Sequence, residues 1–305
     1  MSFKLTILGS SAALPAYGRF PSSQYLTIQN HHFLIDCGEG TQLQLMRYSI
    51  GIHKINHIFV SHLHGDHYLG ITGLIFSMHL QQRDTDLHVY SFRGLEEILL
   101  AQFKHSRSVI NFKIVFHPLT ENIKEIIFED EQLTVETIPL DHKIPTNGFL
   151  FREKPKGLRM DKSKIKTGMR PDQIVQLKKG VDVMDEQDHM LYKVEDFTVA
   201  PHASLSYAYC SDSQPTENIL SQIEGVDLLY HEATFLEDEK EKARQTRHST
   251  AAEAAIIATK AKARKLIIGH FSARYKDLEP VLKEARQHFA ETSLAREGES
   301  YELTD

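Results

Sequence analysis

Short apolar runs and helical periodicity alternate along the first third of the chain. Apolar runs of about four to eight residues are typical of strands buried in a sheet. They predict strands at residues 3–8, 24–28, 32–36, 57–60 and 87–92, of which the second and third form a hairpin that turns at Asn30-His31. Apolar positions three and four residues apart predict helices at residues 38–48, 68–80 and 94–104.

The same alternation returns in the second half. Residues 113–138 are rich in strand patterns, and the C-terminal third predicts strands at 226–230 and 265–269 and helices at 249–262 and 277–289. Ser249 or His248 would cap the first of these helices, because both precede an alanine-rich run with Glu253 near its first turn. Strands that alternate with helices in both halves indicate an α/β (α+β) fold in which mixed sheets are covered by helices.

Residues 152–190 interrupt this alternation and show little apolar periodicity. Basic side chains are concentrated there: Lys154, Lys156, Arg159, Lys162, Lys164, Lys166, Arg170, Lys178 and Lys179. One interpretation is a solvated surface insertion. The other is a protruding basic arm, inserted in a single domain of residues 1–305, that contacts the phosphates of a nucleic acid.

Composition narrows the class of protein. With 305 residues, 41% hydrophobic and 25% charged, the chain has the composition of a globular protein with a sizeable core. The net charge of −6 does not indicate a nucleic-acid partner, so any basic surface must be local. Two distant cysteines, Cys37 and Cys210, fit a reducing compartment, and neither a signal peptide nor a membrane-spanning run is expected. The 18 histidines point toward metal chemistry.

The heptapeptide Ser61-His62-Leu63-His64-Gly65-Asp66-His67 follows the strand at 57–60 and concentrates candidate metal ligands. In an extended segment His62 and His64 point the same way, so both imidazoles can reach one metal ion. Gly65 permits a tight turn, which lets Asp66 and His67 face a second metal. Imidazole combined with carboxylate suits zinc or manganese rather than calcium.

Further candidate ligands lie just beyond later strands, where loops can converge on one edge of a sheet. They are Asp141-His142, Asp212 and His270. Asp212 is the candidate bridge, because the two oxygens of one carboxylate can bind two metals. The pattern therefore predicts a dinuclear site.

These motifs resemble the metallo-β-lactamase superfamily and, within it, most closely the tRNase Z (ribonuclease Z) family. The resemblance spans nearly the whole chain and rests on the seven ligand candidates. It extends to Gly9-Ser10-Ser11-Ala12, Asp36-Cys37-Gly38-Glu39-Gly40-Thr41, His231-Glu232-Ala233-Thr234-Phe235, His248-Ser249-Thr250 and His270-Phe271-Ser272-Ala273-Arg274-Tyr275. It implies a four-layer αββα sandwich, two zinc ions per chain with manganese as an alternative, and a homodimer.

The resemblance also implies residue roles. His62, His64 and His142 would bind one metal, Asp66, His67 and His270 the other, and Asp212 both. A water molecule between the metals would be activated for attack on phosphorus. The expected catalytic residues are Asp66, His248 and Glu232, with His248, oriented by Glu232, giving a proton to the leaving oxygen. Considered alone, His248 would be a surface residue that caps a helix. Asp36 and Glu39 are expected to brace the metal loops or cap the next helix.

Substrate contacts are expected from Arg274, Lys178, Lys179 and Arg19. Arg274 could bind a phosphate through its planar guanidinium, and a structural salt bridge is the alternative. The family motif Pro-x-Lys-x-Arg-Asn, associated with sensing nucleotides beyond the acceptor stem, keeps only its proline and arginine here, at Pro15 and Arg19. The arm keeps the lysine pair and Gly180 but lacks the Gly-Pro element of its tip.

The expected function is that of a cytoplasmic zinc-dependent endoribonuclease that removes the 3′ trailer from precursor tRNA, leaving a tRNA 3′-hydroxyl and a 5′-phosphate on the trailer. No membrane association is expected. A general phosphodiesterase or arylsulfatase with the same site is the rival enzyme, which the basic arm argues against. A thioesterase or lactamase would leave His231-Glu232 and His248 unexplained. A non-catalytic RNA-binding scaffold should have lost metal ligands, and none of the seven is missing.

Overall fold

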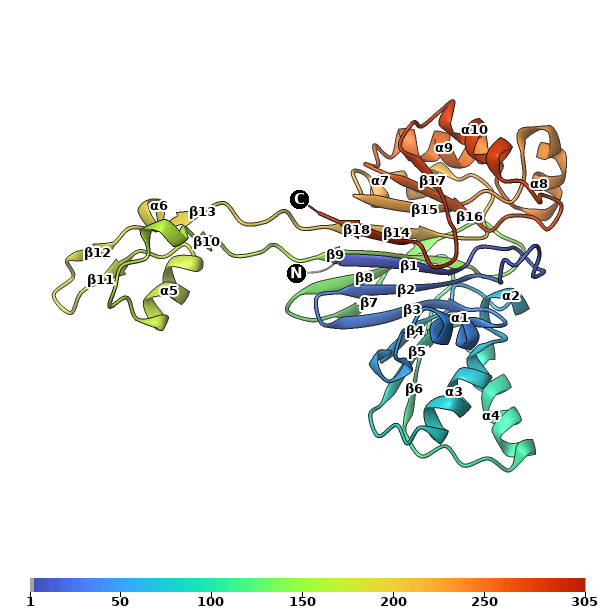
Figure 1. Cartoon of the computed structure of the whole chain (residues 1–305), viewed down its shortest axis with the longest axis horizontal. Coiled ribbons are helices and arrows are strands. Elements are labelled where there is room, and N and C mark those ends of the chain that lie inside the picture. Colours follow the sequence, from blue (N-terminus) through green and yellow to red (C-terminus); the bar gives the residue numbers. More distant parts are fainter. Residues whose placement is uncertain (1–2, 305) are drawn as a thin grey trace. The chain divides into compact units, whose positions relative to one another are not determined.

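Two compact units make up the chain in the computed structural model, which describes residues 3–304. The larger unit combines residues 3–152 with Ser206–Thr304, and the smaller unit is Glu153–Leu205. The larger unit contains two seven-stranded sheets with helices on their outer faces (Figure 1). This arrangement confirms the four-layer αββα sandwich that the resemblance implies.

The first sheet has the strand order β18-β1-β2-β3-β4-β5-β6. Strands β18, β1, β2 and β3 pair antiparallel, whereas β3, β4, β5 and β6 are parallel. The strands are β1 (Phe3–Gly9), β2 (Ser23–Ile28), β3 (His31–Cys37), β4 (His57–Phe59), β5 (Leu87–Ser91), β6 (Ile114–Pro118) and β18 (Ser300–Leu303). Because β3 and β4 are parallel neighbours, the segments that follow them leave the sheet at the same edge.

The second sheet has the order β17-β16-β15-β14-β9-β8-β7. Strands β14 to β17 are parallel, β9 is antiparallel to β14, and β7 is antiparallel to β8. The strands are β7 (Ile126–Glu129), β8 (Leu133–Pro139), β9 (Asn147–Glu153), β14 (Ser206–Cys210), β15 (Leu228–Glu232), β16 (Leu266–Gly269) and β17 (Thr292–Leu294). Asp212 and His270 therefore follow the carboxyl ends of parallel strands.

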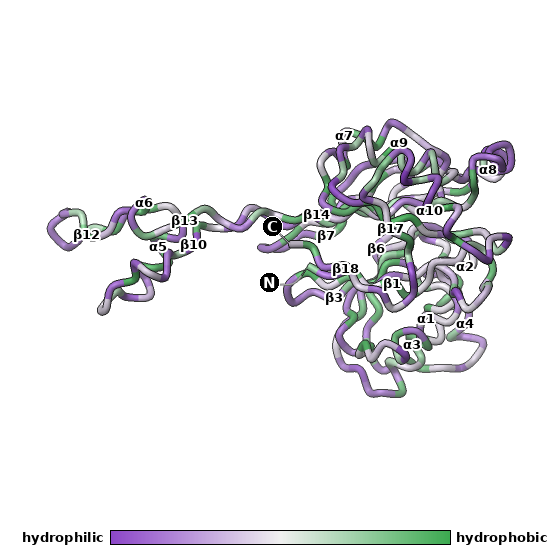
Figure 2. The backbone as a smooth tube through the Cα atoms, turned by 45° about the horizontal axis from the view of Figure 1, so that its top comes forward, coloured by the Kyte–Doolittle hydropathy of each residue, from purple (hydrophilic) through white to green (hydrophobic). Residues whose placement is uncertain are grey.

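Helices cover the outer face of each sheet (Figure 1). The first sheet carries α1 (Thr41–Arg47), α2 (Gly65–Tyr68), α3 (Ile71–Leu80) and α4 (Gly94–Ser106), and the second carries α7 (Leu220–Ile223), α8 (Lys240–Thr246), α9 (Ala251–Lys260) and α10 (Glu279–Arg286). Short 3₁₀ helices are η1 (Ile52–Lys54), η3 (Glu217–Ile219) and η4 (Glu237–Glu239). Figure 2 shows α8 as a hydrophilic segment, in contrast to the apolar strands. Among residues 3–304 no helix is long and apolar enough to cross a membrane.

Aromatic side chains fill the space between the two sheets. Phe33 and Phe59 of the first sheet contact Phe151 of the second, with ring centroids 5.4 and 5.5 Å apart. Phe59 also contacts Phe149 at 5.3 Å. All four rings are buried, and burial of each stabilises the fold by about 1.5–3 kcal/mol. This rigid interior fixes the strand ends from which the candidate ligands project.

Three predicted boundaries were wrong. The hairpin turns at Gln29-Asn30, since β3 already begins at His31. The helix predicted at 68–80 is broken at Gly70, where a Cβ atom would lie 2.1 Å from the carbonyl oxygen of Gly38. The cap of α9 is Thr250, whose hydroxyl accepts from the backbone N–H of Glu253 while the Glu253 carboxylate accepts from the N–H of Thr250. Ser249 and His248 do not cap it because both side chains hydrogen-bond elsewhere.

The smaller unit has its own short elements around three buried side chains, Leu177, Val183 and Phe197. The elements are β10 (Arg159–Met160), η2 (Lys162–Lys164), α5 (Pro171–Lys178), β11 (Val183–Met184), β12 (Met190–Tyr192), α6 (Val194–Phe197) and β13 (Thr198–Val199). The unit extends to Leu205, beyond the predicted boundary at 190. Over Glu153–Leu205 ten lysines and arginines stand against nine aspartates and glutamates, so the cations form a local excess before residue 180 rather than a basic domain.

Three histidines line up across the parallel strands of the first sheet. His57 of β4 stacks on His88 of β5 with ring centroids 5.0 Å apart. His88 Nδ1 lies 2.9 Å from His117 Nε2 of β6. Burial and the neighbouring His88 lower the pKa of His57 to about 3. The folded protein therefore holds a neutral imidazole that the unfolded chain would protonate below about pH 6.5.

Replacing His57 with phenylalanine should reduce the acid sensitivity of the fold. Between about pH 6.5 and pH 3 the unfolded chain binds a proton that folded His57 does not, so the wild type loses up to about 1.4 kcal/mol of stability per pH unit from this group. Urea unfolding at pH 7.5 and pH 5.0 measures the difference. The exposed His105→Phe change is the control. An equal acid loss in wild type and His57→Phe would contradict the assignment.

Candidate metal centre

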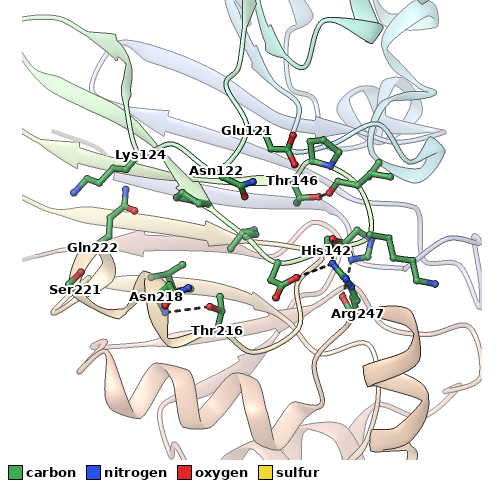
Figure 3. A pocket seen from close by; sticks show the side chains of 17 residues that line it. Glu121, Asn122, Lys124, His142, Thr146, Thr216, Asn218, Ser221, Gln222 and Arg247 are labelled. Carbon is green, nitrogen blue, oxygen red and sulfur yellow. Dashed lines mark hydrogen bonds and ion pairs between the residues drawn. The ribbon is translucent and has the colours of Figure 1, made fainter.

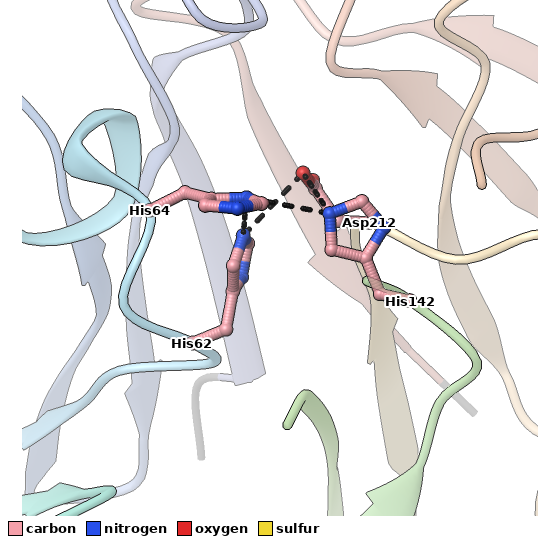
Figure 4. A group of neighbouring side chains, drawn as sticks. All are labelled: His62, His64, His142 and Asp212. Carbon is pink, nitrogen blue, oxygen red and sulfur yellow. Dashed lines mark hydrogen bonds and ion pairs between the residues drawn. The ribbon is translucent and has the colours of Figure 1, made fainter. Parts of the chain in front are cut away.

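Four side chains from three loops of the larger unit form the first candidate ligand group. They are His62, His64, His142 and Asp212, and one ligand atom of each lies within 4.8 Å of all the others. His62 Nε2 is 3.0 Å from His64 Nδ1, which in turn is 3.3 Å from His142 Nε2. Figure 4 shows the three rings and the carboxylate converging. The loops after β4, β8 and β14 thus bring together residues far apart in sequence.

The second group consists of Asp66, His67, Asp212 and His270. His67 and His270 place their Nε2 atoms 3.3 and 3.1 Å from Asp212 Oδ1. In the first group, His62 and His142 approach the other oxygen, Asp212 Oδ2, at 3.5 and 3.7 Å. Each oxygen of Asp212 therefore faces a different set of imidazoles. Burial raises the pKa of Asp212, but His270 and His67 outweigh burial and hold it well below its usual value.

The imidazoles fit a metal because the ring nitrogens that face away from the centre are already hydrogen-bonded. His142 Nδ1 donates to the Arg247 carbonyl at 2.9 Å, and His270 Nδ1 lies 2.9 Å from Thr234 Oγ1. Such outer contacts fix the tautomer and leave Nε2 for the metal. His67 Nε2 is buried and faces the Asp212 and Asp66 carboxylates at 3.3 and 3.5 Å without a well-formed hydrogen bond among residues 3–304. A metal ion between these groups would satisfy the nitrogen, which otherwise costs free energy to bury. These residues suit divalent ions with imidazole and carboxylate ligands.

Asp36 braces the loop that carries four of the seven candidate ligands. Its carboxylate accepts from the Ser61 backbone N–H at 2.7 Å, from His67 Nδ1 at 2.7 Å and from the Tyr209 hydroxyl at 2.6 Å. All of these groups are buried. The expectation that Asp36 supports the metal loops agrees with these contacts. Glu39 does not cap α1, because the N-cap residue of this helix is Gly40.

His248 and Glu232 form a pair beside both ligand groups. His248 Nδ1 is 2.8 Å from Glu232 Oε1, and the His248 ring lies 5.0 Å from the ring of His142 and 5.4 Å from that of His270. Burial lowers the pKa of His248, but the Glu232 carboxylate raises it further, to about 9. Glu232 also accepts from the Ser213 N–H at 2.7 Å and the Thr234 hydroxyl at 2.5 Å. The pair thus consists of a charged imidazole that is hydrogen-bonded to a carboxylate, and other hydrogen bonds hold that carboxylate in place.

A cavity of about 610 Å³ opens onto these groups. His64, Asp66, His248 and His270 line it together with Leu14, Leu69, Phe235 and Ser272. Leu14 and Leu69 are mostly exposed, at 64% and 58%, whereas Phe235 is buried. The cavity therefore has polar groups at its base and apolar side chains around its mouth, which suits a substrate with both phosphates and bases.

The four residues predicted to bind substrate lie in different settings. Arg274 forms an ion pair with Glu239 at 2.5 Å and stacks over Phe235 at 5.1 Å. Arg19 is buried and donates to the Tyr275 carbonyl at 2.7 Å. Lys178 and Lys179 are exposed at the end of α5 in the smaller unit. Substrate contact by these four residues stays a prediction. For Arg274, the ion pair with Glu239 is the structural salt bridge that the sequence left open as the alternative.

Arg247 is a site residue that the sequence did not reveal. Its carbonyl accepts from His142 Nδ1, and its guanidinium donates to the His142 carbonyl at 2.9 Å and lies 3.3 Å from Asp141 Oδ1. Its φ of 55° places it in the left-handed region. The one feature of the sequence that could have pointed to Arg247 is its position directly before His248. Arg247 therefore connects the loop of a candidate ligand with the loop of the His248–Glu232 pair.

Comparisons with known proteins give one matching family model and several full-length relatives. The family model described as Anti-Pycsar protein Apyc1 matches residues 3–206. The chain is 47% identical over 305 residues to Ribonuclease Z of Cytophaga hutchinsonii, covering 100% of this chain and 97% of that protein. It is 41% identical over 296 residues to Ribonuclease Z of Bacteroides fragilis, with 97% of each covered.

Solved structures show the same fold. The short form of human tRNase Z matches with a TM-score of 0.72 and 25% identity over 98% of each chain. The metallo-β-lactamase fold protein YhfI from Bacillus subtilis matches with a TM-score of 0.69 and 19% identity over 99% of this chain and 100% of that chain. The predicted family, fold and enzyme class, a metal-dependent phosphodiester hydrolase, are confirmed. With full-length relatives at this identity and a family model over residues 3–206, the chain belongs to the ribonuclease Z family and to the family that the Apyc1 model describes.

Proposed function

We propose that this tRNA-processing endoribonuclease depends on zinc and removes the 3′ trailer from precursor tRNA in the cytoplasm. The observation that carries the proposal is the pair of ligand groups joined by Asp212, with the His248–Glu232 pair beside them. The products would be a tRNA with a 3′-hydroxyl and a trailer with a 5′-phosphate.

Two zinc ions per chain, with manganese as an alternative, fit the mixture of imidazole and carboxylate ligands. His62, His64 and His142 would hold one, Asp66, His67 and His270 the other, and Asp212 both. When bound, a metal pair supplies a nucleophile at neutral pH and stabilises charge that develops at phosphorus. The division of Asp212 between two sets of imidazoles supports the count of two.

The protein's own residues would complete the hydrolysis. As the new oxygen–phosphorus bond forms, the bond between phosphorus and the 3′-oxygen of the tRNA breaks, and that oxygen needs a proton. His248 is protonated and lines the cavity, so it can donate from Nε2 while Nδ1 stays on Glu232. Glu232 acts by orienting His248 and by holding its charged form. Asp66 would act as a ligand of the second metal, which in turn would position the substrate.

A homodimer is part of the proposal. Leu43 and Met46 of α1 are 61% and 67% exposed, and Leu80 at the end of α3 is 77% exposed. Apolar side chains gathered on neighbouring helices support a protein–protein contact. Light scattering of the purified protein measures the mass directly, and a monomer at micromolar concentration would contradict the dimer.

The test of the function uses two substrates. Purified protein is incubated with a precursor tRNA and with a small phosphodiester, each with and without a chelator, and the RNA ends are mapped. We expect chelator-sensitive cleavage of the precursor, a tRNA 3′-hydroxyl and a trailer 5′-phosphate. A 2′,3′-cyclic phosphate would contradict the mechanism. If only the small diester is hydrolysed, the protein is a general phosphodiesterase. If RNA is bound but not cleaved, the protein is an RNA-binding scaffold.

We also propose that the smaller unit binds the tRNA part of the substrate. Lys162, Lys178 and Lys179 are exposed and have no carboxylate partner within residues 3–304. Such lysines can contact phosphates. The Glu153 N–H donates to the Leu205 carbonyl at 2.9 Å, so a short linker can join the two ends of the unit.

Replacing residues 154–204 with a short Gly/Ser linker should weaken precursor-tRNA binding and spare hydrolysis of a small diester. Lys178→Ala and Lys179→Ala should each lower the slope of log KM against log salt by about one unit, because each lysine neutralises one phosphate. Steady-state kinetics on both substrates over a salt series measures this. Normal precursor processing by the linker variant would make the unit a passive insertion.

A further inference from the structure

A second cavity adjoins the metal pocket in the larger unit. It measures about 660 Å³ and shares two lining residues, His142 and Lys143, with the pocket of the metal centre. The loop before β7, the loop after β8 and the segment at η3 and α7 form its walls (Figure 3). The two cavities therefore lie side by side, with His142 and Lys143 between them.

Several polar side chains of the cavity are available to a ligand. The carboxamides of Asn122 and Asn218 are exposed and make no hydrogen bond with any of residues 3–304. Lys143 is exposed and has no ion pair within the same range. By contrast, the Gln222 carboxamide donates to the Thr137 carbonyl at 2.8 Å, and Arg247 is held by Asp141 and His142. Glu121 is also exposed and has no ion pair within residues 3–304, so the free groups are two amides, one cation and one carboxylate.

This combination suits unpaired RNA. A carboxamide offers one donor and one acceptor side by side and can pair with the edge of a base that is not in a duplex. A lysine at the passage between two pockets can contact a backbone phosphate. The cavity also has hydroxyls from Thr216 and Ser221 in its wall. A strand that enters the metal pocket must continue beyond the bond that is cut, and this cavity adjoins that pocket at His142 and Lys143.

We propose that this cavity binds the first nucleotides of the single-stranded RNA that follows the scissile bond. Lys143 contacts a phosphate next to the cut, and Asn122 and Asn218 contact base edges. The assignment to the trailer side follows from shape, because the tRNA side of the bond leads directly into a folded duplex that does not fit a cavity of this size. The inference rests on the proposed function and adds a subsite to it.

The test compares trailer lengths. The double change Asn122→Ala and Asn218→Ala should lower the ratio of kcat/KM for a long trailer to kcat/KM for a single-nucleotide trailer by about tenfold, the value of one or two lost hydrogen bonds. Asn111→Ala, an exposed asparagine outside the cavity, is the matched control. Thermal unfolding of each variant checks the fold. An unchanged ratio, or equal losses on both trailers, would overturn the proposal.

Crosslinking provides a second measurement. 4-Thiouridine at the first trailer positions should crosslink to peptides that contain residues 121–124 or 216–222. Crosslinks only to peptides outside the cavity would also overturn the proposal. A wild-type protein that cuts neither trailer would instead contradict the proposed function, so the two failures are distinguishable.

Discussion

Asp212→Ala should remove both metals and lower activity on precursor tRNA by roughly 10³-fold or more. The two oxygens of Asp212 approach different imidazoles, Oδ1 near His67 and His270 and Oδ2 near His62. One substitution therefore takes a ligand from each position. A metal centre stabilises phosphoryl charge by several kcal/mol, and each 1.36 kcal/mol is a factor of ten in rate.

His62→Ala is the matched comparison, because His62 belongs to one ligand group only. It should lower the metal content at one position and leave the other largely filled. Asp212→Asn keeps the size of the side chain and one oxygen, so it separates loss of charge from loss of shape. Mass spectrometry of the dialysed proteins gives the metal count per chain. Full occupancy in Asp212→Ala would rule out a shared carboxylate.

The ligands could be predicted because they combine residue type with position. His62, His64, Asp66 and His67 follow a buried strand at once, and Asp212 and His270 also follow strands. Parallel strands of one sheet end at the same edge, so Asp212 and His270 of the second sheet come close together. The heptapeptide follows β4 of the first sheet, and its meeting with them depends on the packing of the two sheets. The combination of imidazole and carboxylate then narrows the choice of metal to zinc or manganese rather than calcium. The residues themselves predicted one metal for His62 and His64 and a second for Asp66 and His67, whereas the placement of His142 and His270 came from the family resemblance. The two groups of side chains in the structure agree with this division.

Contacts between distant loops could not be predicted in this way. Arg247 acts on His142 through its backbone carbonyl, a group that every residue has, so no residue type marks it. At the break at Gly70 the backbone N–H donates to the carbonyl of Cys37, which only the folded chain brings close. Thr250 caps α9 because His248 and Ser249 are already bonded to Glu232 and Ser213. In each case tertiary contacts decide between local alternatives.

The smaller unit shows a second limit of the sequence. Its strands have two or three residues, too few for an apolar period to be visible, and only Leu177, Val183 and Phe197 form its core. In this segment the lysine content of the sequence was therefore easier to recognise than any pattern of apolar residues. Six acidic side chains after residue 180 offset most of the charge of the seven lysines before it. Affinity for tRNA in this unit would thus depend on where its unpaired lysines lie rather than on net charge.

His248→Ala should leave the metal content unchanged and slow precursor cleavage by roughly 10²–10⁴-fold, the usual contribution of a positioned acid. His248 faces the cavity and is held by Glu232 at 2.8 Å, yet the seven ligands form both groups without it. A diester with a nitrophenolate leaving group leaves without protonation, so its hydrolysis should fall much less. Single-turnover rates on both substrates, together with metal analysis, make the comparison.

Glu232→Gln is the companion variant, because it keeps the shape but removes the charge that raises the pKa of His248. It should reproduce part of the His248→Ala loss on precursor tRNA and spare the nitrophenyl diester. The reason is that an imidazole without its carboxylate is a less strongly oriented donor and is less often protonated at neutral pH. Equal losses on both substrates in His248→Ala would contradict proton donation, and a loss of metal would place His248 among the ligands.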